Sequence, residues 1–425
     1  MERTVTTQPA AVRRLRRGWV PPWLLGLALV LALTALLRAP SLLEPAWHDD
    51  EGIFAALGKR VVEGGVLYVD AWDNKPPLVY LVFAAWYGLF GYDVPALRVL
   101  TALAVVGTQL AVFGLGWRLW GTGRGLAAAL LYGVLASTPF FQGNGSFTET
   151  FLVLPAAAGM LAYVLGRERS AGGGTPLGYT AAAGLLLGLA FQFKQVAALE
   201  AAALGLFVLA AEPRPWRQVA ALAAGWLAPW AAVTAYFAAS GALGAYLYAI
   251  LGYYVDQGYL GAESRLPAWA SPLRAVAPLL AAGVVLARRR AGGLRTETLV
   301  SLWLVFAAVG TVMSGRDYPH YLLQALPPAA LAAVRPLPLR RLQRPGLASA
   351  AAAGVLGALM GMTFISSWMT RYPQISTPYY ENAAALLAGR ASVAEYRAFF
   401  EKGESVEWMR RYLEEQGLAG RTVYV

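Results

Sequence analysis

The chain of 425 residues contains no cysteine and only two histidines. The lack of cysteine excludes disulfide bonds, thiolate nucleophiles and thiolate-ligated metals, but it does not indicate a cellular compartment. The sequence also lacks paired histidines for haem, a Walker-type glycine loop, an HExxH metal motif and a Gly-x-Ser-x-Gly elbow. The chain is therefore not expected to couple to ATP by itself.

Charged residues are scarce, at 14%, whereas hydrophobic residues make up 58% and the mean hydropathy is +0.49. A soluble domain carries about 25% charged residues, so there is too little polar surface here to cover a water-soluble globule. The composition also excludes an intrinsically disordered chain. The net charge of +11 would suggest nucleic-acid binding in a soluble protein. Here the arginines cluster between apolar runs, so the sequence predicts an all-α polytopic membrane protein that binds no nucleic acid.

Apolar runs long enough to cross a membrane predict a bundle of about eleven transmembrane helices. The runs fall near residues 19–38, 97–117, 125–142, 150–166, 178–193, 196–211, 218–239, 272–287, 298–313, 320–334 and 346–367. No Ala-x-Ala-like cleavage site follows the first run, which favours an uncleaved helix over a signal peptide. A further run at 76–90 is shorter and opens with two prolines, so it is either a short span or an interfacial helix.

The distribution of lysine and arginine decides between these two interpretations of residues 76–90. If that run is interfacial and the N-terminus lies inside, most basic residues fall in the inner loops, as the positive-inside rule requires. If the run spans the membrane, the basic loops face outward. We therefore predict a multi-pass cell-membrane protein with a cytoplasmic N-terminus and an extracytoplasmic C-terminus. Most acidic residues then lie on the outer face, which suggests an extracytoplasmic active site.

The composition divides the chain into two predicted parts, a transmembrane catalytic domain over residues 1–368 and an extracytoplasmic segment over residues 369–425. Within the second part, 391–400 and 404–415 have the pattern of amphipathic helices, and 421–425 has that of a strand. A lone terminal strand needs a partner. We therefore expect either that the natural chain continues into a larger soluble domain or that the strand pairs elsewhere.

The first outer loop, residues 39–96, holds three consecutive carboxylates, Asp49, Asp50 and Glu51, before an amphipathic helix predicted to reach Val62. Carboxylates at a membrane boundary are costly to desolvate, and they raise one another's pKa. A raised pKa suits a group that accepts a proton near neutral pH, so the three are candidate catalytic residues. The alternative is a solvated helix N-terminus, where acidic residues favour the helix dipole.

Three more charged residues stand at the ends of predicted spans. Lys75 precedes two prolines and is either a point charge for a phosphate or a lysine that snorkels to the interface. Lys194 lies in an otherwise apolar hairpin and needs a partner or an anion. Glu149, at the outer end of a span, is a candidate to ligand a metal, to bind sugar hydroxyls or to cap a helix.

Two other outer segments contribute candidate binding residues. Arg316 suits bidentate phosphate binding, and His320 is either a ligand or a hydrogen-bonded structural residue at a helix start. In the loop over residues 240–270, Tyr254 and Asp256 lie among aromatic residues. Aromatic residues with sparse acids bind sugars, although an aromatic belt at the membrane interface explains them nearly as well.

The order of these motifs along the chain resembles that of a known superfamily. The motifs are Asp50-Glu51, Gly64-Gly65-x-x-Tyr68, Asp73-Asn74-Lys75-Pro76-Pro77-Leu78-x-Tyr80, Arg98, Thr148-Glu149, Phe193-Lys194-Gln195, His320-Tyr321 and Pro327-Pro328. Together they resemble the GT-C superfamily of polyprenyl-phosphate-sugar-dependent membrane glycosyltransferases. Within it, they are most similar to the family of the protein O-mannosyltransferases and lipid A aminoarabinose transferases, glycosyltransferase family 39.

The resemblance implies a role for several residues. Asp50 matches the acid that acts as general base or orients the acceptor, and Lys75 matches the lysine that holds the donor phosphate. Glu149 matches an acid near the substrate or a metal, so Glu149 and Asp50 are the candidate metal ligands. In the aminoarabinose transferases an acid that helps to bind metal precedes the lysine. This chain has Asn74 there, so a divalent metal is not required by the sequence.

We therefore predict an inverting transfer of a hexose or pentose from a polyprenyl-phosphate-linked donor to a hydroxyl of a lipid, glycan or protein acceptor. Asp50 takes the proton, with Asp49 and Glu51 beside it, and Lys75 with Arg316 or Lys194 stabilises the leaving phosphate. Glu149, His320, Tyr254 and Asp256 are the candidate substrate-binding residues. The alternatives are a lipid-linked glycan polymerase or ligase, and a transporter of lipid or sugar without enzymatic activity. A transporter is disfavoured because the ionisable residues stand mostly at the ends of spans.

Overall fold

The protein is described by a computed structural model over residues 21–45, 47–170, 174–256, 271–290, 294–316, 318–336, 376–400, 411–412, 414–415 and 417. Over these residues the regular structure is helical, apart from an isolated bridge between Leu67 and Ala71. The prediction of an all-α protein is therefore confirmed.

Within the described ranges, ten helical segments form the main bundle. They are α1 (Pro22–Arg38), α4 (Val94–Trp120), α5 (Thr122–Leu135), α6 (Thr148–Glu168), α7 (Leu177–Phe191), α8 (Ala198–Ala211), α9 (Pro215–Ala239), α12 (Ser271–Arg290), α13 (Thr298–Val312) and α14 (Leu326–Ala333). The remaining elements are η1 (Ala39–Leu43), α2 (Asp49–Val62), α3 (Leu78–Phe90), η2 (Pro139–Phe141), η3 (Gln195–Ala197), α10 (Leu243–Leu247), the π-turn η4 (Tyr248–Gly252), α11 (Tyr253–Asp256), η6 (Pro319–Ala325), α16 (Ser376–Leu387) and α17 (Val393–Ala398).

Each predicted apolar run before residue 336 contains a helix, and the run at 346–367 lies outside the described residues. Among the described helices, α1, α4, α6 and α9 are long and apolar enough to cross a membrane, and several apolar helices are shorter. The run at 320–334 begins as the 3₁₀ segment η6 and continues as α14. Pro327 and Pro328 stand in the first turn of α14, where the missing N–H groups cost nothing.

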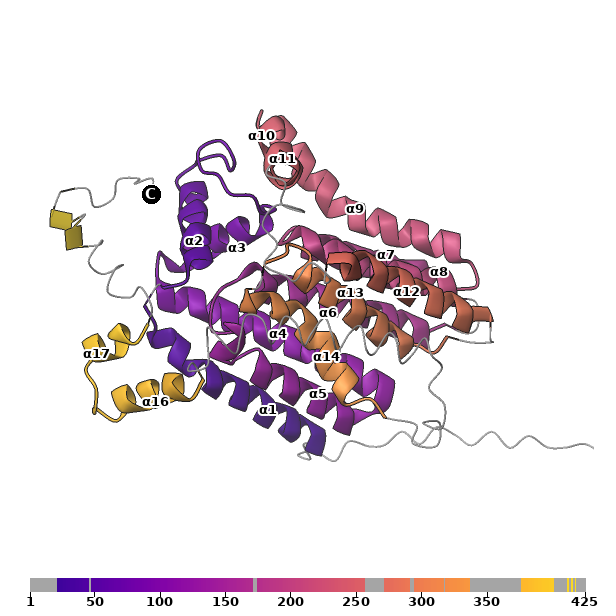
Figure 1. Cartoon of the computed structure of the whole chain (residues 1–425), viewed down its shortest axis with the longest axis horizontal. Coiled ribbons are helices and arrows are strands. Elements are labelled where there is room, and N and C mark those ends of the chain that lie inside the picture. Colours follow the sequence, from indigo (N-terminus) through magenta and orange to yellow (C-terminus); the bar gives the residue numbers. More distant parts are fainter. Residues whose placement is uncertain are drawn as a thin grey trace, which may run out of the picture.

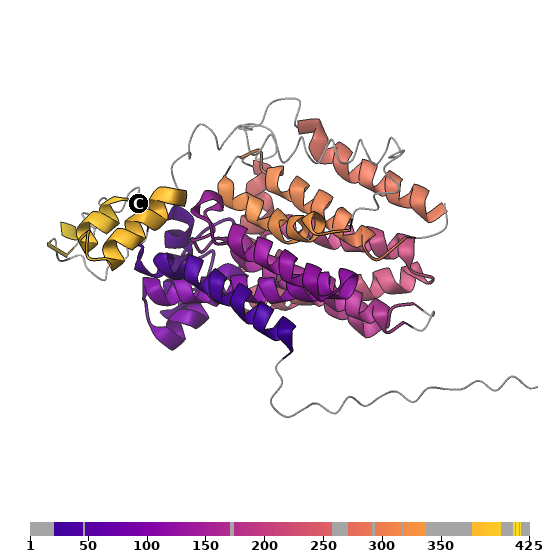
Figure 2. The ribbon, with the colours of Figure 1, turned by 90° about the horizontal axis from the view of Figure 1, so that it is seen from below.

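The long helices lie side by side, and the short elements gather at one end of the bundle (Figures 1 and 2). Helix α4 packs against α5 and α6, α7 packs against α6 and α9, and α13 packs against α8. Figures 1 and 2 both place α2, α3, α16 and α17 together at the same end. Helices α2 and α3 therefore lie at the same end of the bundle as α16 and α17.

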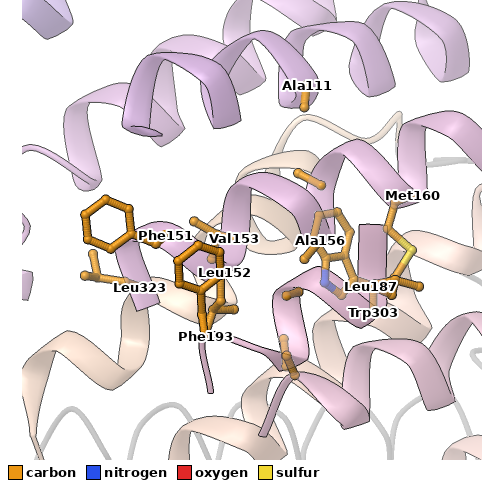
Figure 3. Packing of buried hydrophobic residues seen from close by; sticks show 14 of the residues in the cluster. Ala111, Phe151, Leu152, Val153, Ala156, Met160, Leu187, Phe193, Trp303 and Leu323 are labelled. Carbon is orange, nitrogen blue, oxygen red and sulfur yellow. The ribbon is translucent and has the colours of Figure 1, made fainter. Parts of the chain in front are cut away.

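The core is built from large apolar side chains of several helices. Phe151 of α6 stacks on Phe193 with ring centroids 5.9 Å apart. Trp303 of α13 and Leu187 of α7 are almost fully buried. Figure 3 shows Phe151 and Phe193 in one group of buried side chains, and Trp303 and Leu187 in a second group farther along the bundle. This packing holds the ends of α6 and of the segment after α7 in fixed positions.

Helix α3 has 13 residues, which is too short for a membrane span of about 20 residues. It packs closely on α2, because Gly58 of α2 faces Phe83 of α3, and a Cβ at Gly58 would lie 2.8 Å from the Cβ of Phe83. The predicted amphipathic helix up to Val62 is confirmed as α2. The interfacial position of residues 76–90 stays a prediction.

The C-terminal segment contains a helix that the sequence pattern did not reveal, α16, before the predicted one. The prediction for residues 391–400 is confirmed as α17, which starts at a capping box formed by Ser392 and Glu395. Most of the predicted helix at 404–415, and all of the predicted strand at 421–425, lie outside the described residues. The division of the chain near residue 368 stays a prediction.

Candidate active site

The acidic triplet forms the first turn of α2, where carboxylates are favoured by the helix dipole. The three side chains have different environments because successive residues of a helix point about 100° apart. Asp49 is exposed, the Asp50 side chain is 29% exposed, and Glu51 is buried. The triplet therefore does not act as one unit.

Asp50 lies between a lysine and a histidine that are distant in sequence. Its carboxylate oxygens are 3.9 Å from Nζ of Lys75 and 3.7 Å from Nε2 of His320. Burial alone would raise the pKa of Asp50. The positive charges around it, with Lys75 first, outweigh burial and lower this pKa below its ordinary value. The expectation that the acidic triplet raises the pKa of Asp50 is therefore wrong, because cations and not carboxylates are its main charged neighbours.

Lys75 is held by a second carboxylate, Asp73. Its ammonium lies 3.1 Å from Oδ2 of Asp73 and 5.1 Å from the centroid of the Phe54 ring. Burial disfavours the charged lysine, but Asp73 and Asp50 outweigh it and raise the pKa of Lys75 above its ordinary value. Asp73 is fixed in turn by the Tyr80 hydroxyl, which donates a hydrogen bond of 2.8 Å to it. Lys75 is thus a charged group in a fixed position.

The backbone around Lys75 is fixed by side chains from other parts of the chain. The Tyr68 hydroxyl donates to the carbonyl of Lys75 at 2.7 Å, and Tyr68 itself has a positive φ of 67°. The carbonyl of Asn74 accepts from the Tyr254 hydroxyl at 3.0 Å and from Nε2 of Gln195 at 3.2 Å. Tyr254 therefore reaches the Lys75 motif through a hydrogen bond to its backbone.

Glu149 and Lys194 form a close ion pair beside this cluster. Glu149 stands in the first turn of α6 and also accepts from the Thr148 hydroxyl at 2.9 Å. The Lys194 ammonium lies 3.7 Å from the centroid of the Tyr321 ring. The sequence analysis predicted that Lys194 needs a partner or an anion, and the structure shows that this partner is Glu149 of α6.

His320 joins the cluster from η6. Its ring stacks on Phe147, with centroids 4.1 Å apart and planes 5° apart, and its Nδ1 lies 2.9 Å from Oε1 of Gln142. These contacts direct Nε2 toward Asp50. Four predicted residues, Asp50, Lys75, Glu149 and Lys194, are thereby gathered around one histidine.

The other two predicted binding residues differ in their relation to the cluster. Arg316 lies close enough to Asp50 for its charge to contribute to the lowered pKa of that carboxyl. Asp256 is exposed at the end of α11, and among the described residues no contact joins its carboxylate to the cluster. Its predicted role in substrate binding stays a prediction.

Glu51 belongs to a separate, closed network. It lies 2.8 Å from Nη2 of Arg98 on α4 and accepts from the Ser146 hydroxyl at 2.9 Å. The Arg98 side chain is fully buried and lies 3.7 Å from a second carboxylate, Glu44. Burial raises the pKa of Glu51, although Arg98 opposes this. Glu51 thus anchors the first turn of α2 to α4.

Glu44 connects this network to the C-terminal segment. It accepts from Nδ2 of Asn144 at 2.8 Å, from the Trp47 indole at 2.8 Å and from the Tyr379 hydroxyl of α16. The Arg98 network therefore joins the first outer loop, α4 and α16.

The carboxylates present do not have the arrangement of a metal site. Among the described residues, no three histidine or acidic side chains gather as potential ligands. The two candidate ligands, Asp50 and Glu149, each face a lysine instead. Asn74, at the position where the resemblance implies an acid, accepts two hydrogen bonds with its backbone carbonyl.

Sequence reasoning missed residues that hold the cluster together. Asp73 and Tyr80 appear in the motif around Lys75, but no role was assigned to them. A buried lysine requires a counter-ion, and an acid two positions earlier was the available signal. Gln142 and Phe147, which orient His320, carried no comparable signal, because their partner is more than 170 positions away.

The comparisons with known proteins concern the family resemblance and the fold of the chain. A sequence model of the dolichyl-phosphate-mannose-protein mannosyltransferases matches residues 74–238, which include Lys75, Arg98, Glu149 and Lys194. The structure of ArnT from Cupriavidus metallidurans bound to undecaprenyl phosphate superposes with a TM-score of 0.57 at 17% identity, over 88% of this chain and 74% of that chain. The chain has the GT-C fold. Its resemblance to the family of the protein O-mannosyltransferases and aminoarabinose transferases is thereby confirmed.

Further comparisons complete this result. The GT-C fold is matched again by ArnT from the same organism in the apo state, with a TM-score of 0.56, 17% identity, and coverage of 89% of this chain and 75% of that chain. An oligosaccharyltransferase from Archaeoglobus fulgidus in the apo form matches with a TM-score of 0.47 and 15% identity, over 81% of this chain and 55% of that chain. No curated protein matches the sequence. The protein is a membrane protein, and its described residues include apolar helices long enough to cross a bilayer.

Proposed function

We propose that this protein transfers a hexose or pentose from a polyprenyl-phosphate donor to an acceptor hydroxyl, with inversion at the anomeric carbon. The reaction takes place at the extracytoplasmic surface, and the N-terminus lies in the cytoplasm. The observation that carries the proposal is the position of Asp50, whose carboxylate faces both Lys75 and His320 within 4 Å. A displacement at a phosphate-activated sugar needs a base for the attacking hydroxyl and a positive charge for the leaving phosphate. Asp50 and Lys75 place such a base and such a cation next to each other.

Asp50 acts as the general base. The acceptor oxygen forms a bond to the anomeric carbon while its proton passes to the Asp50 carboxylate, and the bond from the anomeric carbon to the phosphate oxygen breaks. A carboxylate with a lowered pKa is fully ionised at neutral pH, so it is ready to accept the proton. The weaker basicity that comes with a low pKa is compensated when the donor phosphate shares the Lys75 charge.

The leaving polyprenyl phosphate is stabilised by the cations of the cluster. Lys75 is the primary one, because Asp73 keeps it charged despite its burial. Arg316 and Lys194 add positive charge near Asp50. Lys194 already has Glu149 as partner, so its role is shared between orienting that acid and attracting the phosphate. Glu149, His320, Tyr254 and Asp256 surround the sugar and the acceptor.

Two alternative functions make different demands on this cluster. A lipid-linked glycan polymerase or ligase uses a similar site but takes a donor with more than one sugar. A transporter places its ionisable groups on broken helices near the membrane midplane. Asp50 and Glu149 instead stand in the first turns of α2 and α6, and Lys75 stands three residues before α3. These positions support the enzyme over the transporter.

The direct test uses the purified full chain in nanodiscs and undecaprenyl phosphate carrying one radiolabelled hexose or pentose. Detergent extracts of membranes serve as the source of acceptors. The proposal expects release of undecaprenyl phosphate and transfer of the label, with loss of both in Asp50→Asn. A donor that stays intact, while label crosses the bilayer in proteoliposomes, would establish a transporter. The anomeric configuration of the product, determined by NMR, tests inversion.

A further inference from the structure

A cavity lies at the end of the bundle opposite to Asp50. Its volume is about 500 Å³ and it lies between the C-terminal ends of α4 and α6 and the segment before α13. Five charged side chains line it, namely Arg118, Arg167, Glu168, Arg295 and Glu297. None of these residues takes part in the cluster around Asp50.

The helices fix the depth of this cavity in the membrane. Along α4, Arg118 lies about 30 Å from Arg98, which belongs to the network beside the candidate active site. Likewise, Glu168 ends α6, whose first turn carries Glu149. A distance of about 30 Å is the thickness of the hydrocarbon core of a bilayer. With the Asp50 cluster at one membrane surface, as proposed above, the cavity lies at the level of the lipid headgroups of the opposite surface.

Among the described residues in and around the cavity, one cation is left unpaired. Arg118 pairs with Glu168 at 3.3 Å, and Glu297 pairs with Arg335 at 3.6 Å. In contrast, the Arg295 side chain is exposed and forms no hydrogen bond or ion pair within the part of the chain that the structure describes. The cavity thus matches a ligand with a single negative charge.

Arg167 is held rigidly at the cavity wall. Its partner Glu212, 3.0 Å away, also accepts from the Tyr163 hydroxyl at 2.6 Å and from both the backbone N–H and the hydroxyl of Thr175, at 3.0 and 2.6 Å. The guanidinium also packs on Phe207, with 5.4 Å to the ring centroid. Because Glu212 is fully engaged, Arg167 keeps its position whether or not a ligand is present, which lowers the entropic cost of binding.

We propose that this cavity binds the phosphodiester headgroup of an anionic membrane phospholipid. Arg295 supplies the uncompensated charge, and Arg118 and Arg167 have further N–H groups to donate to the phosphate oxygens. Basic pockets between transmembrane helices at this depth suit such headgroups. The acidic side chains accept hydrogen bonds from the hydroxyl groups of a glycerol headgroup. The site is separate from the proposed active site and does not depend on the sugar transferred.

The test compares lipid retention in variants of the full chain. The protein is purified in detergent, supplied with equimolar phosphatidylglycerol and phosphatidylcholine, and examined by native mass spectrometry. We expect a preference for phosphatidylglycerol of about tenfold in the wild type, which corresponds to about 1.4 kcal/mol. Arg295→Gln should abolish this preference and Arg295→Lys should retain part of it. Arg124→Gln removes an equal charge from an exposed position of α5 outside the cavity and should retain it fully.

Several outcomes would overturn the proposal. Equal retention of the two lipids by the wild type would do so, and so would equal losses in Arg295→Gln and Arg124→Gln, since general attraction by the basic surface would then explain the binding. Competition by millimolar inorganic phosphate that displaces phosphatidylglycerol completely would assign the cavity to a free anion instead. Thermal unfolding of each variant identifies any variant that is misfolded, and Arg295→Lys then provides the informative comparison.

Discussion

Asp50 and Glu51 are neighbours in sequence and of similar chemistry, yet they belong to two different regions of the molecule. The Lys75 region contains Asp50 and is partly open to solvent, whereas the Arg98 region contains Glu51 and is closed. Cations lower the pKa of Asp50, while burial raises that of Glu51. In the proposed reaction, one helical turn presents Asp50 to the substrate, while the next acid, Glu51, anchors the turn to α4. Adjacent acids at a boundary need not share a function.

The largest effect is expected from removing Arg98, the central cation of the closed Arg98 region. Arg98→Ala leaves Glu51 and Glu44 buried without their cation, which costs about 3 to 5 kcal/mol. We expect the variant to lose its thermal unfolding transition or to aggregate on size-exclusion chromatography. Arg124→Ala removes an exposed arginine and should leave the unfolding temperature unchanged. Normal stability of Arg98→Ala would show that the closed region does not support the fold.

In the partly open Lys75 region, the largest effect is expected from Asp50→Asn. Loss of a general base lowers the rate by about 10² to 10⁴-fold, and the partly exposed position predicts an unchanged unfolding temperature. Transfer of radiolabelled sugar from undecaprenyl phosphate measures the rate. Asp49→Asn, one position earlier and exposed, should keep most of the activity. If the two variants lose equal activity, the distinction between neighbouring acids fails.

Removing the Lys75 ammonium from the Lys75 region should change both kcat/KM and its pH dependence. Lys75→Met is expected to lower kcat/KM by about 100-fold, because it removes charge stabilisation of the leaving group. It also removes the main charge that lowers the pKa of Asp50, so this pKa rises. The base then becomes protonated at a higher pH, and the acidic limb of the kcat/KM profile moves upward. Lys59→Met, at an exposed pair with Glu63, is the control and should leave the limb in place.

The smallest effect is expected at the contact between α16 and Glu44, at the edge of the Arg98 region. Tyr379→Phe removes the hydroxyl that α16 donates to Glu44, and a hydrogen bond to a charged group contributes about 1.5 to 3 kcal/mol. We expect a modest decrease in the unfolding temperature and an unchanged kcat/KM. A large loss of activity at normal stability would instead mean that α16 takes part in the reaction.

The sequence predicted those parts of the molecule whose signals are local. Periodic apolar runs predicted the bundle helices, and the motif around Lys75 predicted a cation beside the acid at position 50. The environment of Glu51 could not be predicted from the sequence, because its partner Arg98 is 47 positions away on another helix. Helix α16 was missed for a similar reason, since its buried Tyr379 faces Glu44, far away in the sequence. Pairings over such distances depend on the tertiary structure.

The most direct test of the central claim is the binding of undecaprenyl phosphate to wild-type, Asp50→Asn and Lys75→Met proteins under identical conditions. If Asp50 handles the acceptor proton and Lys75 handles the donor phosphate, Asp50→Asn binds the lipid at least as tightly as the wild type. Lys75→Met then binds it about tenfold more weakly, as expected for the loss of one charged contact. Unchanged binding by Lys75→Met, or loss of binding in Asp50→Asn, would contradict the division of roles between these two residues.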